Sequence, residues 1–261
     1  LLAPAYRRLD VVAAISPDDA ERFGALGVPA DRRSVMGDAR FDQVWARAQA
    51  VDLASPLLRS LGGFTGTTLV AGSTWPADEE QLVPAIAAAR NAGHPLRVIL
   101  VPHEPTPAHL AALEGRLGAH GIASVRLSRV EEGTAPGETI VVDRVGVLGD
   151  LYALADVAYV GGGWGTAGLH SVLEPAAFGA PVLFGPLHAN AREAADLIAA
   201  GGAFELAAGD AVDGRLAPLL RDSGARHAAG NAARAYVQAN LGAAERGSRI
   251  IERLLEFPGS D

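Results

Sequence analysis

Residues 159–190 read YVGGGWGTAGLHSVLEPAAFGAPVLFGPLHAN, and this stretch decides the fold class. It predicts the end of an apolar strand, a glycine-rich turn, a helix and a second apolar strand ending at Phe184. The helix is expected to begin near Ser171 or Val172, because Pro175 is tolerated in a first turn, where N–H groups have no helical partner. Glycines let a ligand approach the backbone and a helix start attracts anions, so the stretch predicts a phosphate or nucleotide site.

Strand and helix patterns alternate along the rest of the chain. Short Val-, Ile- and Leu-rich runs separated by helical runs indicate an α/β fold with a mainly parallel sheet covered on both faces. Strands are predicted at Leu9–Ile15, Ser34–Asp38, Thr67–Ala71, Leu96–Val101, Ile122–Leu127, Glu138–Val142, Val157–Val160, Pro181–Phe184 and Ala203–Leu206. Helices are predicted from Pro17 to near Gly24–Gly27 and at Asp78–Asn91, Pro107–Ala119, Arg192–Ala200, Gly209–Arg221 and Ala225–Leu255. Phe41–Gln49 leads into a polar, Ala-rich connection, where we expect a domain boundary.

Unusual residues collect where these strands end. The five segments are AGSTW (71–75), VPHEP (101–105), VDRVG (142–146), GGGWG (161–165) and FGPLH (184–188). Because parallel strands present their carboxyl ends along one edge, the five segments predict a ligand site at a single rim.

Composition excludes several functional classes. The net charge of −8 argues against a nucleic-acid partner, and the absence of cysteine excludes thiolate chemistry. All 22 basic residues are arginine, so the lysine that P-loop NTPases, protein kinases and Schiff-base enzymes require is missing. No apolar run approaches the ~18 residues of a membrane span, so this part is expected to be soluble. The start at Leu1 resembles the middle of a longer protein more than a natural N-terminus.

The segment GWGTAG (163–168) matches the G-x-G-x-x-G dinucleotide fingerprint between a strand and a helix. That fingerprint belongs on the first strand of its domain, with an acidic residue about 20 positions later. Here it follows a late strand, and the next strand ends at Phe184 without an acid. Binding of NAD is therefore disfavoured. The alternative that the glycines serve only the backbone conformation of a turn stays open.

Several single residues at the predicted rim allow two interpretations each. Glu174 in the first helical turn either complements the helix dipole or accepts hydrogen bonds from a ribose. His170 is either a buried, satisfied histidine or a ligand donor. Ser73 and Thr74 either cap the following helix or contact a ligand, and His103 either pairs with Glu104 or contacts one.

No metal site is predicted. His103, His170 and His188 lack the short spacing of metal ligands, and no cysteine supplements them.

Several segments together resemble the 3-deoxy-D-manno-octulosonic acid (Kdo) transferases, glycosyltransferases of the GT-B fold. They are VMGDARFDQV (35–44), VAGSTWPADEE (70–80), ILVPHEP (99–105), VVDRVGVLGDLYALADVAYVGGG (141–163), GLHSVLEPAAFGAPVLFGP (168–186) and EAADLI (193–198). The resemblance implies a doubly wound, Rossmann-like parallel sheet with C-terminal helices. It also implies that residues 1–40 end an N-terminal acceptor domain and that residues 41–261 form the C-terminal donor domain.

For function, the resemblance implies metal-independent, inverting transfer of Kdo from CMP-Kdo to a lipid A precursor, without a cofactor, at the cytoplasmic face of the bacterial inner membrane. The catalytic base is expected in the N-terminal domain, outside this chain, so the chain alone should bind CMP without catalysing transfer. Membrane and acceptor contacts are expected only through that absent part. We expect glycine-turn N–H groups and the helix start to hold the phosphate and Glu174 to hold the ribose. The implied CMP-Kdo contacts are Ser73, Thr74, Pro102, His103, Val145, Gly146, Val147, Gly163, His170, Ser171, Val172, Leu173 and Glu174.

Three positions depart from the family pattern, which commonly has Arg at His103, Glu at Val147 and Asn at Ser171. The change at His103 weakens the fixed charge expected near the phosphate, and Val147 offers only its backbone. Two alternatives stay open: a GT-B transferase or epimerase that uses a UDP-sugar, and a nucleotide-binding module without catalysis.

Overall fold

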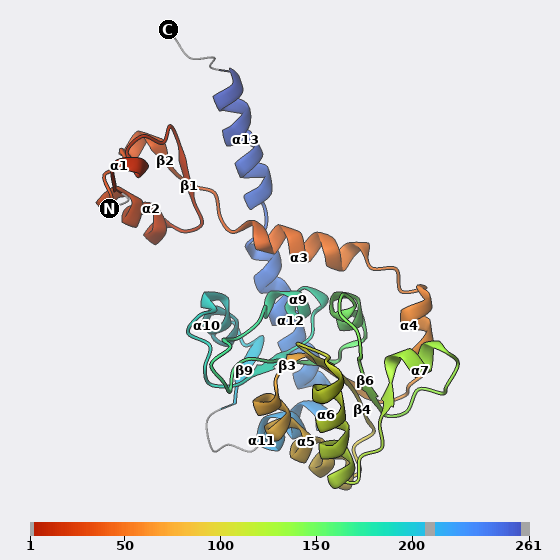
Figure 1. Cartoon of the computed structure of the whole chain (residues 1–261). Helices are drawn as coiled ribbons and strands as arrows, with labels where there is room; N and C mark the ends of the chain where they lie inside the picture. The colour runs from red at the N-terminus through yellow and green to blue at the C-terminus, as the bar shows by residue number, and fades with distance from the viewer. Residues whose placement is uncertain (1–2, 207–211, 257–261) are drawn as a thin grey trace. The chain divides into compact units, whose positions relative to one another are not determined.

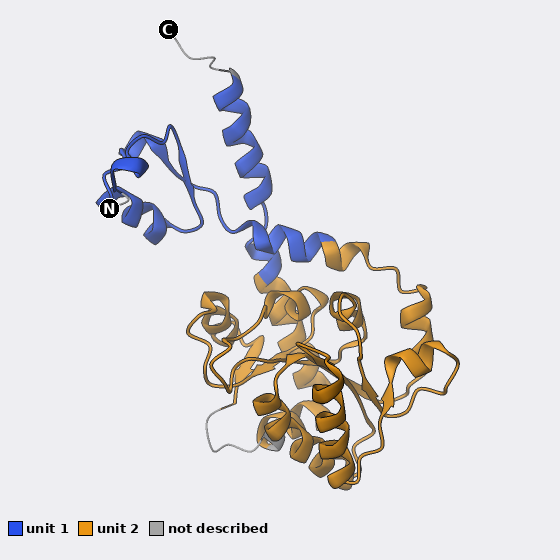
Figure 2. Cartoon of the chain, in the orientation of Figure 1, with its two compact units in different colours: residues 1–46, 237–261 blue, residues 47–236 orange. Residues whose placement is uncertain are grey.

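The computed structural model describes residues 3–206 and 212–256. The chain divides into two compact units, one formed by residues 1–46 and 237–261 and the other by residues 47–236 (Figure 2). We describe each unit by itself.

The unit of residues 47–236 is built on a seven-stranded sheet in the order β5-β6-β4-β3-β7-β8-β9, in which every neighbouring pair is parallel. The chain runs outward from β3 to one edge and then returns to β7, on the other side of β3. The carboxyl ends of β3 and β7 therefore flank the topological switch point, where such sheets bind ligands. The strands are β3 (Thr67–Thr74), β4 (Leu96–Pro102), β5 (Val125–Arg126), β6 (Thr139–Val141), β7 (Val157–Val160), β8 (Val182–Phe184) and β9 (Ala203–Glu205).

Helices cover both faces of this sheet, as the Val-rich strands predict. One core cluster joins α5 (Pro76–Asn91), α6 (Pro107–Ala119) and α11 (Val212–Arg221) to strand residues such as Leu69 and Leu100. The opposite cluster joins α4 (Pro56–Ser60), α7 (Leu127–Glu131), α8 (Leu148–Leu151) and the 3₁₀ turn η2 (Tyr152–Leu154) to Val70 and Ile99. Figure 1 shows α5, α6 and α11 beneath the sheet and α9 (Leu173–Phe178) and α10 (Arg192–Ala199) above it.

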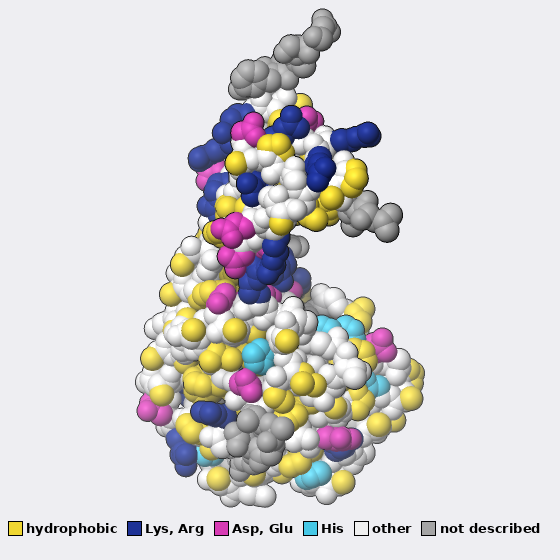
Figure 3. Space-filling view, turned by 90° about the vertical axis from the view of Figure 1, so that its left-hand side faces the viewer, with side chains coloured by type: hydrophobic (Ala, Val, Ile, Leu, Met, Phe, Trp, Pro, Cys, Tyr) yellow, Lys and Arg dark blue, Asp and Glu magenta, His cyan; other side chains and the backbone are white. Residues whose placement is uncertain are grey.

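The smaller unit contains the parallel pair β1 (Val12–Ala14) and β2 (Arg33–Val35), with α1 (Ala3–Tyr6), α2 (Pro17–Ala25) and the 3₁₀ turn η1 (Ala30–Arg32). Its charged side chains pair with one another, as Arg22 does with Asp19 (2.9 Å) and Arg40 with Asp38 (2.7 Å). Figure 3 shows arginine and acidic side chains interspersed on its surface. The predicted start of α2 is confirmed: Ser16 caps it, and Pro17 is its first residue.

Some predicted elements differ from the structure. The single helix predicted at Ala225–Leu255 is wrong, because the chain forms α12 (Ser223–Ala239) and α13 (Ala243–Glu256), separated by Gly242 at φ +95°. Asp42 accepts hydrogen bonds from the Gly242 and Ala244 N–H groups (2.7 and 3.0 Å), which satisfies the new helix start.

Two further differences concern a strand that is shorter than predicted and a helix that was not predicted. The strand predicted at Ile122–Leu127 is reduced to Val125–Arg126, because Leu127 already begins α7. The segment Phe41–Gln49, for which no helix was predicted and which was expected to lead into the Ala-rich connection, lies within α3 (Ala39–Ala50). The predicted helix start at Gly209 lies outside the described residues.

Candidate functional site

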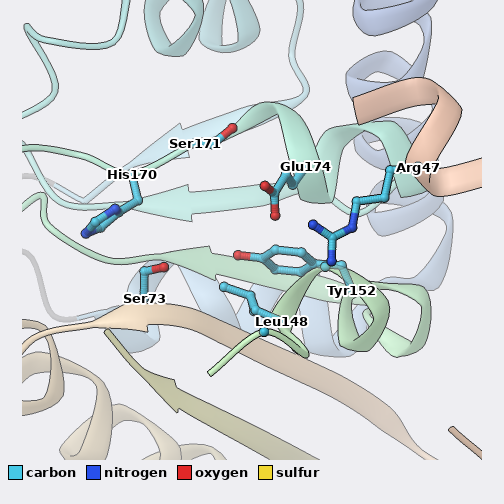
Figure 4. Close-up of a pocket in the computed structure, with 9 residues that line it drawn as sticks. Arg47, Ser73, Leu148, Tyr152, His170, Ser171 and Glu174 are labelled. Atoms are coloured by element: carbon cyan, nitrogen blue, oxygen red, sulfur yellow. The ribbon is translucent and has the colours of Figure 1, made fainter. Parts of the chain in front are cut away.

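A cavity of about 290 Å³ opens at the predicted rim, beside the carboxyl ends of β3 and β7 (Figure 4). All of its lining residues belong to the unit of residues 47–236. They are Arg47, Ser73, Gly146, Leu148, Gly149, Tyr152, His170, Ser171 and Glu174. They come from four separate segments of the chain, at residues 47, 73, 146–152 and 170–174, which the folding of the sheet and its crossovers brings together.

Strand β3 ends in strained backbone at this cavity. Ser73 has φ +52°, which no other described residue except glycine approaches, and the β3–β4 register shifts between Gly72 and Thr74. Such a bulge turns a side chain away from its regular direction, and backbone strain of this kind concentrates at functional sites. The bulge presents Ser73 to the cavity.

The glycine turn after β7 packs backbone against backbone. A Cβ at Gly161 would overlap the Ser73 carbonyl, and one at Gly162 (φ +96°) would overlap the Gly168 carbonyl. The N–H groups are also engaged, since Gly161 donates to the Gly72 carbonyl (2.9 Å) and Gly162 to Asp78 (3.0 Å). These two N–H groups are therefore not free to hold a phosphate, contrary to expectation.

The buried side chain of Asp78 holds the glycine turn in place through hydrogen bonds. Its carboxylate is 1% exposed and accepts hydrogen bonds from the Tyr159 hydroxyl (2.7 Å), the Gly162 N–H (3.0 Å) and the Trp75 N–H (2.9 Å). Burial raises the pKa of Asp78, and the hydrogen bonds from Tyr159 and Gly162 partly offset this rise. The carboxylate thereby joins the β3–α5 loop to the glycine turn.

Glu79, the next residue, is also buried and also links neighbouring loops through its contacts. It is 2% exposed, accepts from the Thr74 hydroxyl (3.0 Å) and lies 2.9 Å from His109 Nε2. Burial raises its pKa, and the nearby His109 opposes the rise. His109 Nδ1 lies 3.0 Å from the Glu104 carbonyl, so this chain of contacts holds the loop after β4.

Trp75, His103 and His170 form an aromatic stack beside the cavity. The His103 ring lies 4.7 Å from Trp75 and 4.4 Å from His170, measured between centroids. The Trp75 indole N–H donates to His170 Nε2 (3.2 Å), which assigns the proton of a neutral His170 to Nδ1. Burial and the neighbouring His103 lower the pKa of His170, so the ring is a neutral hydrogen-bond donor at physiological pH.

Glu174 lies in the first turn of α9, which begins at Leu173 after the cap residue Val172. The helix start predicted from Pro175 is thereby confirmed. Burial raises the pKa of Glu174, and the positive charge of Arg47 partly offsets this rise. Figure 4 shows the Arg47 guanidinium reaching from its helix toward Glu174 and Tyr152. The cavity thus combines a carboxylate, a cation and neutral donors.

The structure brings five of the predicted contact residues together in the cavity: Ser73, Gly146, His170, Ser171 and Glu174. The others do not line it. Six of them are buried and two, His103 and Val145, are exposed; the buried ones are Thr74, Pro102, Val147, Gly163, Val172 and Leu173. Their roles stay predictions.

Sequence reasoning missed Arg47, Leu148, Gly149 and Tyr152. Arg47 lies on α3, in a segment interpreted only as leading into a connection, and no local motif marks it. Tyr152 follows the predicted rim segment 142–146 by a few residues, and its aromatic side chain resembles an ordinary core residue. Among the described residues, no cluster of His, Asp or Glu suits a metal ion. None of the described helices is long and apolar enough to span a membrane.

The chain is similar in sequence to known transferases. A family model described as 3-deoxy-D-manno-octulosonic-acid transferase (kdotransferase) matches residues 1–43. The 3-deoxy-D-manno-octulosonic acid transferase of Bordetella pertussis is 34% identical over 96% of this chain, and that of Haemophilus influenzae is 26% identical over 96%. The chain spans 58% of the length of each of these relatives.

Solved structures share the fold. The C-terminal CMP-Kdo binding domain of WaaA from Acinetobacter baumannii matches with a TM-score of 0.58 and 24% identity, over 77% of this chain and 98% of that domain. The UDP complex of S. aureus MnaA matches with a TM-score of 0.65 and 16% identity, over 96% of this chain and 62% of that one. The parallel, doubly wound sheet is that of GT-B proteins. Almost the whole length of the chain is therefore similar in sequence to 3-deoxy-D-manno-octulosonic acid transferases.

Proposed function

We propose that this chain supplies the CMP-Kdo site of an enzyme that transfers Kdo to a lipid A precursor in lipopolysaccharide synthesis. The observation that carries the proposal is the position of Glu174. Its carboxylate lies in the first turn of a helix, in a cavity at the switch point of the sheet, next to a cation and neutral donors. A nucleotide needs acceptors for its ribose and donors for its phosphate, and the cavity offers both.

The proposed roles follow from the chemistry of each group. Glu174 accepts hydrogen bonds from the ribose hydroxyls. His170, through Nδ1–H, and the backbone of residues 171–174 face the phosphate, and Ser73 and Gly146 border the ligand. The Gly161 and Gly162 N–H groups take no part, because the protein itself uses them.

The proposed reaction is direct displacement with inversion. The acceptor hydroxyl attacks the anomeric carbon of Kdo while its proton passes to a base, and the bond to the phosphate oxygen of CMP breaks. We assign the base and the acceptor to the part of the enzyme that precedes this chain, with residues 1–40 as the end of that acceptor domain. The whole enzyme is proposed to work at the cytoplasmic face of the inner membrane.

Calorimetric titration of the chain with CMP tests the proposal. We expect CMP to bind with a dissociation constant below the millimolar range, and Glu174→Ala to weaken it about tenfold or more. Glu80→Ala, an exposed glutamate outside the cavity, is the matched control and should bind like the unaltered chain. Absence of binding at millimolar CMP, unchanged binding by Glu174→Ala, or tighter binding of UDP would each contradict the proposal.

A further inference from the structure

Tyr152 is a buried residue whose polar end has no partner. Its side chain is 2% exposed and packs in the core cluster with Ile99 and Leu151. Among the described residues, none forms a hydrogen bond with its hydroxyl. The ring is buried, but the hydroxyl oxygen is not among the buried side-chain atoms that lack a partner, because it borders the cavity, where a ligand can supply its hydrogen bond.

The hydroxyl points into the cavity. Tyr152 lines it together with Ser73 and Glu174, and Figure 4 shows the hydroxyl end of the ring directed into the space beside them. Gly72 provides the room, because a Cβ there would overlap the Tyr152 hydroxyl. The end of β3 is thus shaped to admit this polar atom to the cavity.

The hydroxyl and Glu174 have complementary hydrogen-bonding capacities. Burial, and then the negative charge of Glu174, raise the pKa of Tyr152, so the hydroxyl keeps its proton and donates. Glu174, when ionised, only accepts. A ligand hydroxyl between them satisfies both groups, since it accepts from Tyr152 and donates to Glu174.

We infer that Tyr152 and Glu174 together hold a ribose hydroxyl of the nucleotide, and that this pair makes the cavity selective for ribonucleotides over deoxyribonucleotides. The inference rests on the proposed function and adds a residue to it. A site built to bond a hydroxyl discriminates strongly against an analogue that lacks it, because its buried polar groups are then left without partners.

Dissociation constants for CMP, 2′-deoxy-CMP and 3′-deoxy-CMP, measured by calorimetry on the unaltered chain and on Tyr152→Phe, test the inference. The unaltered chain should bind one of the deoxynucleotides at least about tenfold more weakly than CMP. Tyr152→Phe should weaken CMP by a similar factor, leave that deoxynucleotide unchanged and so remove the discrimination. Its melting temperature should not fall, because the deleted hydroxyl has no protein partner.

Tyr236→Phe is the matched control, since the Tyr236 hydroxyl bonds to Asp196 (3.1 Å) outside the cavity. It should bind all three nucleotides like the unaltered chain. If Tyr152→Phe weakens all three equally, or none, the inference is overturned while the proposed function stands. Absence of CMP binding to the unaltered chain overturns both.

Discussion

Glu174 is a carboxyl group whose surroundings disfavour its ionised form. Its carboxylate is partly withdrawn from water, and the charge of Arg47 offsets only part of the resulting rise in pKa. Arg47 is itself about half exposed and lies 3.9 Å from Asp150, so water and a second carboxylate share its charge. The burial of the carboxyl group therefore disfavours its ionised form, despite the nearby Arg47.

This cost gives a pH-dependent prediction for Glu174→Gln. Because the folded-state pKa is raised, the carboxyl group contributes stability below its ordinary pKa of about 4.5, and this contribution is lost as pH rises through the raised value. Glu174→Gln should therefore melt higher than the unaltered chain at pH 7 to 8, with a difference that shrinks toward zero as pH falls toward 4.5.

Thermal melts at several pH values, without nucleotide, measure this difference. Glu80→Gln is the control, because the Glu80 side chain is 55% exposed. Its melting temperature should track that of the unaltered chain at every pH. A lower melting temperature of Glu174→Gln at pH 7 would mean that attraction to Arg47 exceeds the cost of burial.

At the scale of elements, the cavity depends on how the loops after β3 and β7 are joined. Asp78 makes that junction, and removing it deprives the Tyr159 hydroxyl and two backbone N–H groups of their acceptor. Asp78→Ala should lower the free energy of unfolding by about 3 kcal/mol, because each unsatisfied buried donor costs roughly 1–3 kcal/mol.

Urea denaturation measures this loss, and Glu80→Ala, two residues further along α5, is the control. That exposed substitution should change the free energy of unfolding by no more than about 0.5 kcal/mol. A loss of similar size in both variants would show that Asp78 is an ordinary first-turn acid of α5.

The elements that position the cavity follow from local patterns. Strand β7, the glycine turn and the start of α9 are visible in residues 159–190, because Pro175 limits where the helix begins and the strand is uniformly apolar. Helix ends that depend on contacts of single residues are harder to predict from the sequence. The break between α12 and α13 at Gly242 involves a hydrogen bond to Asp42, which lies 200 positions earlier in the chain, so local patterns do not reveal it.

The side chains that complete the cavity are less predictable for the same reason. Asp78 and Glu79 resemble the acids of any first helical turn, yet both are buried against the rim. Arg47 lies outside the segments that carry the resemblance and Tyr152 lies inside one without any chemical signal of its own, and only the packing of the sheet brings them beside Glu174. The pattern of residue types predicts the place of the site, whereas contacts between distant segments decide its composition.

At the scale of the whole molecule, the candidate site belongs entirely to the unit of residues 47–236. The proposed nucleotide site is therefore assigned to that unit, and we propose that the catalytic base and the acceptor lie elsewhere in the enzyme.

A crystal structure of the chain with CMP tests the central claim most directly. We predict density for one CMP in the cavity lined by Ser73, His170 and Glu174, with the ribose hydroxyls within hydrogen-bonding distance of the Glu174 carboxylate and the Tyr152 hydroxyl. CMP bound at another place, or bound in this cavity with its ribose directed away from Glu174, would contradict the account.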